Sequence, residues 1–406
     1  MGWFVLLLQL ACLFSAAALR PAAPRTATAT RVHSSSLERE NESGGAEDVF
    51  GGAIGPLPSV SSKINFPDAT PRNVKTDLWV VGAGTLGSLA AKQWRAKFPS
   101  AKVVAETLTT TRHAEFTAVG IDARTRSSRN DDNTSELDRS AKNVLICFPP
   151  STTASTQEFF GELAEACRLW AGPLGGGRLL YTSSTAVYGD SHGNTVTETF
   201  RVDTRTGRST RQLGAEEQKV TRGGDVMRLA GLYNAQRGPH TYWLRAGTVE
   251  GNEDAMVNML HYEDAAAVCV AALVAGVTGC NIDSNIYSNS NKDSLLLQNQ
   301  NIFLAADDAP VSRLDICTAA LASRQFPEGK MPVFGSKQGP PGKLVDCSWT
   351  REKLGWRPKY PSFNGYMRRL GGEEVAEPQP KAAAGAGKEA KKSLLWLPGD
   401  DDEDGL

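Results

Sequence analysis

Short apolar runs alternate with stretches of helical periodicity through the middle of the chain. The runs predict buried strands, whereas apolar residues that recur every three or four positions predict helices. Strands are expected at 78–81, 102–105, 143–147, 178–182 and 225–229, and helices at 84–98, near 111–119 and at 156–170. This alternation predicts an α/β fold, in which helices cover both faces of a doubly wound parallel sheet.

The two ends of the chain differ in composition from this predicted body. We expect a bipartite targeting presequence at 1–40, a Gly-, Ser- and Pro-rich linker at 41–72, a folded body at 73–370 and a disordered tail at 371–406. The body is expected to end in a small C-terminal substrate lobe and to carry an Asn/Ser-rich insertion at about 281–300. Within the tail, Leu394–Pro398 form an apolar patch that either docks on the body or a partner or belongs to the disordered segment.

The first forty residues have the composition of a targeting presequence. Trp3 to Leu19 is an apolar run of signal-peptide length, and Ala16-Ala17-Ala18 offers a cleavage site. The following stretch is rich in Arg, Ser and Thr and has no acidic residue before Glu38, which is typical of a transit peptide. Together they resemble the two-part presequence of algae with secondary plastids, so we expect import into a plastid. Secretion is the alternative, and no other stretch is long and apolar enough to cross a membrane.

Composition and charge indicate which kinds of ligand the protein could bind. The 44 basic residues nearly balance the 45 acidic ones, so the chain has no clear surface for nucleic acid. The seven cysteines show neither C-x-x-C pairs nor zinc-type spacing, which indicates buried reduced thiols and no metal site. A small-molecule substrate is the expected partner, and a homodimer stays open.

The strongest motif lies where the first predicted strand meets the first helix. Gly82-x-Gly84-x-x-Gly87 is the spacing of a dinucleotide-binding loop. The first glycine allows a tight turn, the second leaves space for a pyrophosphate, and the third lets the helix pack on the sheet. Thr85 and Leu86 lie inside the loop and are assigned to the same cofactor site.

The ends of the later strands add further candidates for the cofactor site. Glu106 closes the second strand, where a carboxylate accepts the ribose hydroxyls of NAD, while Arg112 could pair with the 2′-phosphate of NADP. The cofactor is therefore NADP or NAD, with a slight preference for NADP that rests on the plastid location. Pro149 and Pro150 end the next strand of the pattern and are expected to form the wall on the nicotinamide side.

Several landmarks now occur in a fixed order. They are Gly82-x-Gly84-x-x-Gly87, then Pro149-Pro150-Ser151, then Ser183-Ser184-Thr185-Ala186-Val187-Tyr188-Gly189-Asp190, and finally the segment Arg228 to Arg237. Over about residues 75 to 368 the chain resembles the short-chain dehydrogenase/reductase superfamily, specifically the NAD-dependent epimerase/dehydratase-like extended group and its atypical members. The resemblance implies a Rossmann-type sheet, and it gives Ser184 the role of the hydroxyl that polarises a substrate carbonyl.

One departure from that family affects the chemistry. Active members use a Tyr-x-x-x-Lys pair about 25 residues after the serine, but this chain has no tyrosine between Gly189 and Leu232. Tyr188, Asp190 and His192 follow Ser184 on the same loop and are the candidate substitute proton donors. Of these, Tyr188 is the one that we assign to the catalytic site beside Ser184. Two functions remain open: an oxidoreductase or epimerase acting on a sugar-nucleotide or similar polar metabolite, and a non-catalytic dinucleotide-binding regulator or RNA-associated protein.

Overall fold

The computed structural model describes residues 74–130, 140–172, 177–204, 211–216, 223–275, 301–335 and 339–373. The expected presequence, linker, Asn/Ser-rich insertion and Leu394–Pro398 patch lie outside these residues.

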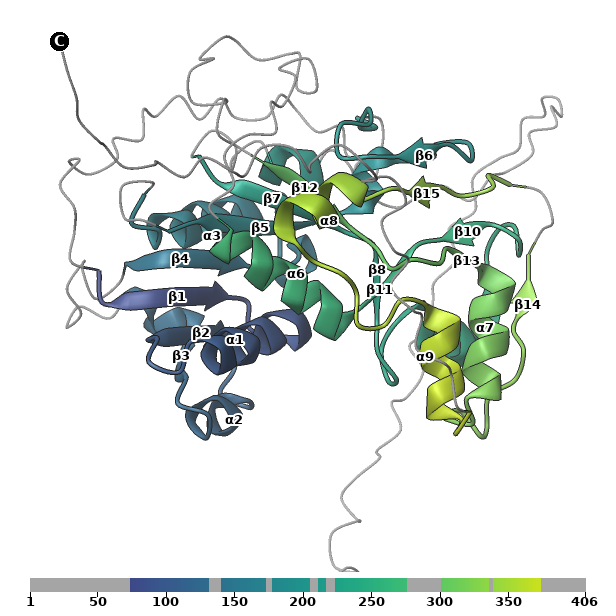
Figure 1. Ribbon diagram of the computed structural model, residues 1–406, viewed down its shortest axis with the longest axis horizontal. Coiled ribbons are helices and arrows are strands. Elements are labelled where there is room, and N and C mark those ends of the chain that lie inside the picture. The colour runs from purple at the N-terminus through teal and green to yellow at the C-terminus, as the bar shows by residue number, and fades with distance from the viewer. Residues whose placement is uncertain are drawn as a thin grey trace, which may run out of the picture. The chain divides into compact units, whose positions relative to one another are not determined.

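A seven-stranded parallel sheet forms the centre of the fold (Figure 1). Its strands are β1 (Thr76–Val81), β2 (Val103–Thr107), β3 (Asp122–Thr125), β4 (Ala141–Ile146), β5 (Leu179–Ser184), β7 (Asp225–Leu229) and β12 (Ile302–Ala305). They lie in the order β12-β7-β5-β4-β1-β2-β3, so the chain grows outward from β1 in one direction and then from β4 in the other. This order confirms the doubly wound, Rossmann-type sheet, and it places a topological switch point between β1 and β4.

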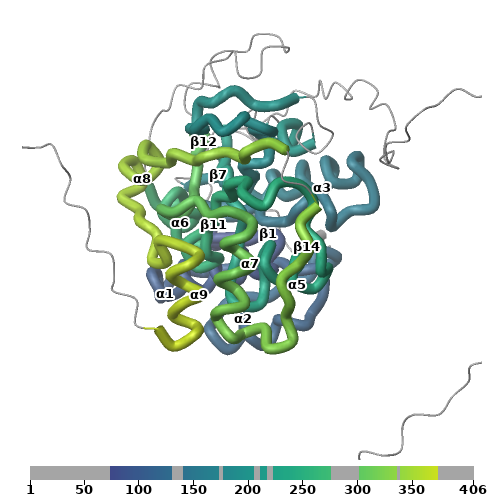
Figure 2. Tube along the Cα trace, turned by 90° about the vertical axis from the view of Figure 1, so that its right-hand side faces the viewer, coloured from purple at the N-terminus to yellow at the C-terminus, as the bar shows by residue number. Residues whose placement is uncertain are grey.

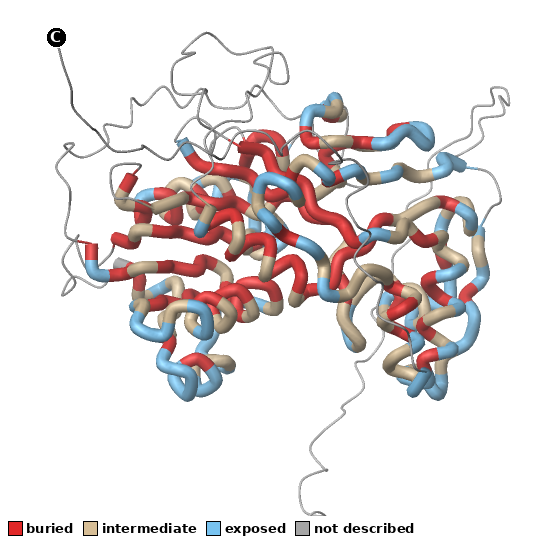
Figure 3. The backbone as a smooth tube through the Cα atoms, in the orientation of Figure 1, coloured by how far each residue is buried: buried red, intermediate tan, exposed pale blue. Residues whose placement is uncertain are grey.

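Alternate residues of β1 supply two separate hydrophobic cores, one on each face of the sheet. Leu78 and Val80 pack on one face with α1 (Thr85–Lys97) and α6 (Tyr262–Val274). Trp79 and Val81 pack on the opposite face with α3 (Thr156–Arg168). The alternation follows from the two-residue period of a strand, and it explains why all four side chains are fully buried. Figure 3 shows the buried segments concentrated along the central strands.

A third hydrophobic cluster lies in segments that follow β7 and β12, and we call this part the second lobe. It contains β8 (Gly231–Tyr233), β11 (Met259–His261), α5 (Pro239–Ala246), α7 (Arg313–Ala322) and α9 (Phe363–Leu370). Helix α7 packs against both α5 and α9 (Figure 2). The cluster consists of Tyr233, Met259, Val311, Ile316, Ala320, Phe363 and Met367. The second lobe therefore has a small core of its own.

Short elements complete the described fold. They are α2 (His113–Thr117), β6 (Thr195–Val196), β9 (Thr248–Val249), β10 (Met256–Val257), β13 (Val311–Ser312), β14 (Val333–Phe334), β15 (Leu344–Val345) and α8 (Ser348–Leu354). The short strands join in pairs, β10 with β13, β14 with β9 and β15 with β6, as do β11 and β8. Within the described ranges, no helix combines the length and apolar character needed to cross a membrane.

Candidate dinucleotide site

A cavity of about 680 Å³ opens at the carboxyl ends of β1, β4 and β5. Segments 82–87, 107–109, 147–150, 181–184 and 229–232 contribute to its wall. Of the residues assigned from sequence, Gly82, Gly84, Thr85, Leu86, Gly87, Arg112, Pro149, Pro150 and Ser184 line it, and Glu106 and Tyr188 do not. The cavity lies beside the topological switch point, where open α/β sheets bind their ligands.

The three glycines of the loop meet different surroundings. A Cβ atom on Gly82 would lie 2.7 Å from the backbone nitrogen of Phe148, and Gly82 has a φ of +86°. A Cβ on Gly87 would lie 2.7 Å from the carbonyl oxygen of Gly82. A Cβ on Gly84 would meet nothing within 4 Å. The first and third glycines are therefore required by backbone packing, whereas the space beside Gly84 is open.

Helix α1 begins directly behind this open space. Its N-cap is Gly84, which provides no side chain to cap the helix. The N–H groups of a first helical turn have no carbonyl partner within the helix, and the helix dipole favours negative charge there. Because the loop leaves room in front of these groups, it can receive a pyrophosphate against bare main chain.

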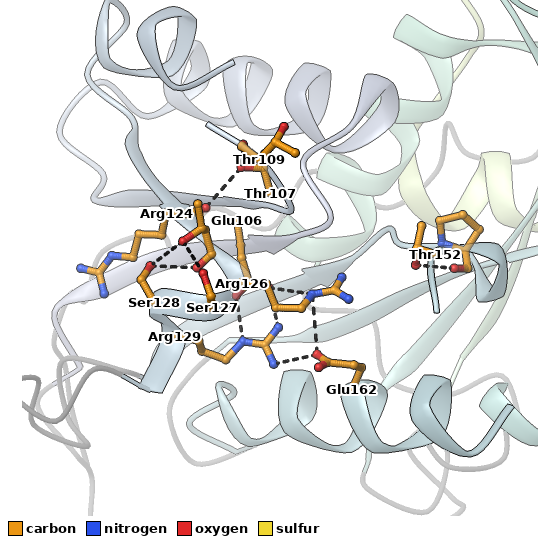
Figure 4. Close-up of polar contacts among 12 residues, drawn as sticks. Glu106, Thr107, Thr109, Arg124, Arg126, Ser127, Ser128, Arg129, Thr152 and Glu162 are labelled. Carbon is orange, nitrogen blue, oxygen red and sulfur yellow. Dashed lines mark hydrogen bonds and ion pairs between the residues drawn. The ribbon is translucent and has the colours of Figure 1, made fainter. Parts of the chain in front are cut away.

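The end of β2 differs from the sequence expectation. The Glu106 side chain is buried, and its carboxylate accepts a hydrogen bond of 2.8 Å from Nε of Arg129 and a second, shorter one from Nη2 (Figure 4). The cavity wall is formed there by Thr107, Leu108 and Thr109 instead. Glu106 is thus held in an ion pair beneath the surface where its carboxylate was expected to contact a ribose.

Arginines are the charged residues of the wall. Arg112, Arg126 and Arg237 line the cavity, and no carboxylate, imidazole or lysine ammonium belongs to the described lining. Arg112 is anchored because its Nη1 donates to the carbonyl oxygen of Gly84 at 2.9 Å. A cavity with only positive side chains favours an anionic ligand.

The end of β5 carries a network of hydroxyl groups. Gln212, in the helical segment 211–216, donates from Nε2 to the Tyr181 hydroxyl at 3.1 Å and to Ser183 Oγ at 3.2 Å. Ser183 in turn donates to the buried carboxylate of Glu216. Ser184 Oγ accepts from the N–H of Ala186 at 3.2 Å, which leaves its hydroxyl hydrogen for another acceptor. Because Ser184 also lines the cavity, its hydroxyl can donate to a ligand there.

Tyr188 lies in the core, away from the cavity wall. Its hydroxyl donates to the carbonyl oxygen of Thr197 at 2.9 Å and accepts from Nη1 of Arg228 at 3.1 Å. Burial raises the pKa of Tyr188 to about 12, although the nearby Arg228 guanidinium acts in the opposite direction. The structure does not bring this predicted proton donor to the site, because its hydroxyl is engaged elsewhere.

Sequence reasoning missed several residues of the wall. Arg126 follows β3, a polar strand that has no apolar run to reveal it. Gln212 and Tyr181 come together only through folding, since 31 positions separate them. Arg237 was available as a signal, because it ends the last of the four landmarks.

Comparison with solved structures supports the fold, whereas comparison of sequences finds no relative. No protein-family model matches the chain, and no curated protein matches its sequence. Among solved structures, dTDP-glucose 4,6-dehydratase from Bacillus anthracis in complex with NAD is 11% identical, with a TM-score of 0.53 over 73% of this chain and 95% of that one.

Two epimerase structures are similar to the same extent. UDP-glucose 4-epimerase from Stenotrophomonas maltophila, with bound NAD and formylated UDP-arabinopyranose, is 14% identical with a TM-score of 0.52, over 73% of this chain and 98% of that one. UDP-glucuronic acid 4-epimerase from Bacillus cereus, in complex with NAD, is 16% identical with a TM-score of 0.50, over 73% and 99%. At these identities the likeness shows the fold alone, and that fold is the one found in NAD-dependent epimerases and dehydratases of sugar nucleotides.

Proposed function

We propose that this protein binds NAD or NADP in the cavity and acts as an oxidoreductase or epimerase on a sugar-nucleotide or similar polar metabolite. The observation that carries the proposal is the open space at Gly84, which lies before the first turn of α1 in a cavity whose charged side chains are arginines. The solved structures reported above support it, because each contains NAD.

The residues of the cavity suggest how a substrate is held. The nicotinamide cofactor, when bound, supplies the hydride acceptor or donor. Ser184 orients a substrate hydroxyl or carbonyl, since its hydrogen is free of the contact with Ala186. Arg237 lies at the side of the second lobe and can pair with a phosphate of the substrate, because a guanidinium binds phosphate oxygens in a bidentate manner.

The described cavity wall contains few groups that could donate or accept a proton near neutral pH. Burial raises the pKa of the Cys147 thiol to about 12, and burial also raises the pKa of Tyr181 far above its ordinary value. Neither group exchanges protons readily near neutral pH. This favours, as a second candidate, a regulator that binds the dinucleotide without turnover.

Titration of the full chain with NADH and NADPH tests the binding step through nicotinamide fluorescence. We expect Gly84→Val to weaken binding at least tenfold, because the added methyl groups occupy the space for the pyrophosphate. Gly161→Val is the matched control, since a Cβ on Gly161 also meets nothing within 4 Å but lies on α3 outside the cavity wall. Equal affinity of the two variants would overturn the proposal.

The choice between enzyme and regulator depends on the fate of the bound cofactor. Incubation with a panel of nucleotide sugars and simple carbonyl compounds, followed by absorbance at the reduced nicotinamide band and by product analysis, separates the two. Turnover that falls in Ser184→Ala supports the enzyme. Tight binding without oxidation, reduction or epimerisation across the panel supports the regulator.

The localisation of the protein is a separate proposal: import into a plastid of secondary endosymbiotic origin. It is supported by the apolar run at Trp3 to Leu19 and the acid-free Arg/Ser/Thr stretch that follows. A fluorescent reporter fused to residues 1–40 should enter the plastid of a suitable alga. Export of the reporter to the medium would support secretion instead.

A further inference from the structure

The corner of the cavity at the end of β2 contains residues that can distinguish NAD from NADP, which the glycine loop cannot do. We infer that this corner selects NADP over NAD, with Arg126 and Arg112 binding the 2′-phosphate of the adenosine ribose. The inference rests on the proposed function, since it concerns the same dinucleotide. It depends on two observations: the carboxylate at this corner is already paired, and the cavity wall beside it is cationic.

The first observation concerns Glu106. Both of its carboxylate oxygens accept hydrogen bonds from Arg129, one from Nε at 2.8 Å and one from Nη2, and the side chains of the two residues are 1% and 4% exposed. A carboxylate that receives two ribose hydroxyls would have to leave this buried pair and uncover an arginine. Because an uncompensated buried charge is costly, Glu106 is a poor acceptor for the ribose of NAD.

The second observation concerns Arg126, which lines the cavity. Its Nε lies 3.6 Å from Oε1 of Glu106 and 3.6 Å from Oε2 of Glu162, and its guanidinium lies over the ring of Phe148 at 4.7 Å from the ring centre. These contacts hold the side chain, which is 13% exposed, in one place. In Figure 4 the tip of Arg126 extends beyond the two carboxylates, toward the side where Thr152 lies. Since Thr152 also lines the cavity, the tip points to the cavity side.

The surrounding charges do not cancel this positive wall. Arg126 and Arg129 balance Glu106 and Glu162, whereas Arg112 and Lys92 share the single carboxylate of Glu115. Of these charged groups only Arg112 and Arg126 line the cavity, whereas the three carboxylates lie outside its wall. A dianionic phosphate gains from this excess of positive charge, whereas a neutral ribose hydroxyl does not.

Uncharged polar residues complete the corner. Thr107 and Thr109 line the cavity beside the arginines, and Thr107 Oγ1 donates to the carbonyl oxygen of Thr109 at 2.8 Å. That contact, with the 2.9 Å contact between Thr107 Oγ1 and Nε2 of His113, fixes the turn after β2 beside the arginines. The combination of two guanidinium groups and a polar turn matches a phosphate ester better than a diol.

Calorimetric titration of the full chain with NADP and with NAD, at one salt concentration, tests the inference. We expect NADP to bind at least tenfold more tightly. Adenosine 2′,5′-bisphosphate and 5′-AMP serve as a second pair of probes, because they differ in the 2′-phosphate alone, and the same order of affinity is expected.

Three variants locate the effect. Arg126→Met and Arg112→Met should each weaken NADP binding more than NAD binding, so that the ratio of the two affinities falls about tenfold. Arg124→Met is the matched control: Arg124 lies on β3, pairs with Asp122 and covers the ring of Trp79, and it does not line the cavity. Thermal unfolding shows whether Arg126→Met still folds, and Arg112→Met, whose side chain is 34% exposed, decides the matter if it does not.

The outcomes separate this inference from the proposed function. Equal or tighter binding of NAD by the unaltered protein would overturn the NADP preference while leaving dinucleotide binding intact. Failure of both dinucleotides to bind would overturn the proposed function itself. A preference for NADP that survives in both arginine variants would assign the phosphate to other residues and overturn the roles given to Arg112 and Arg126.

Discussion

The two ends of the cavity use their polar residues in opposite ways. At the dinucleotide end, which comprises Gly82–Gly87, Thr107–Thr109, Arg112 and Arg126, the wall is bare backbone and positive charge. At the network end, Tyr181–Ser184 and Gln212 line the wall, and the buried residues Glu216, Arg228 and Tyr188 lie behind them. Most polar groups of this end are bound to one another. One end leaves room for a ligand, whereas the other uses its hydrogen bonds to stabilise the protein.

This difference changes how a family motif should be interpreted. Ser183 and Tyr188 belong to the same landmark as Ser184, yet Ser183 is bound to Glu216 and Tyr188 to Thr197 and Arg228. Of the three hydroxyls, only that of Ser184 both lines the cavity and keeps its hydrogen for a ligand. A motif residue therefore serves chemistry only where the fold leaves it a free donor.

The largest effect is expected at the network end. Arg228 and Glu216 are both completely buried and joined by an ion pair of 2.7 Å. Arg228→Leu should lower the free energy of unfolding by about 3–5 kcal/mol, because it removes the positive charge that compensates the buried Glu216 carboxylate. Urea denaturation measures the loss. The double variant Arg228→Leu/Glu216→Leu should recover much of it, and a single-variant loss below about 1 kcal/mol would contradict the comparison.

The glycine loop gives the next largest effect. Gly87→Ala places a methyl group 2.7 Å from the Gly82 carbonyl oxygen and 3.0 Å from Cγ1 of Val80, so the free energy of unfolding should fall by about 1–3 kcal/mol. Gly84→Ala should change stability by less than about 0.5 kcal/mol, because its Cβ enters open space. Thermal unfolding compares them, and equal losses would show that Gly84 is also needed for backbone packing.

A smaller effect is expected at Tyr188. Tyr188→Phe removes the hydrogen bonds to Thr197 and from Arg228 and should cost about 1 kcal/mol of folding free energy. Dinucleotide affinity and any turnover should stay unchanged, since the hydroxyl does not reach the cavity. Loss of turnover with a normal unfolding curve would return Tyr188 to the role of proton donor.

The strands that were predicted from sequence are those with apolar runs, because burial on both faces of a parallel sheet demands such runs. β1, β2, β4, β5 and β7 all lie where they were expected. β3 was missed because Asp122–Thr125 is polar, as an edge strand can be. β12 was also not predicted, although Ile302–Ala305 are all apolar. Composition indicates burial, so it detects central strands better than edges.

The site, too, contains residues whose role could be predicted from the sequence and residues whose role could not. The glycine loop was predictable because its three glycines act within one turn of the chain. The state of Glu106 was not, because Arg129 lies 23 positions further on and their pairing depends on how the chain returns after β3. Contacts between distant segments decide which polar side chains are free, and those contacts leave no local pattern.

The smallest effect is expected at Cys147, which lies between the two ends of the cavity. Burial raises the pKa of this thiol to about 12, against a weaker opposing contribution from its hydrogen bond with Thr182. The folded state therefore keeps the proton at pH values where the unfolded chain, with a thiol pKa near 9, begins to lose it, so stability falls as the pH rises above that value. At pH 9 the cost is about 0.5 kcal/mol for this one group. Urea unfolding of the protein and of Cys147→Ala at pH 7 and pH 9 isolates it, because the other cysteines are common to both. A stability difference between the two proteins that does not change with pH would show that the thiol ionises as readily in the folded protein as in the unfolded chain.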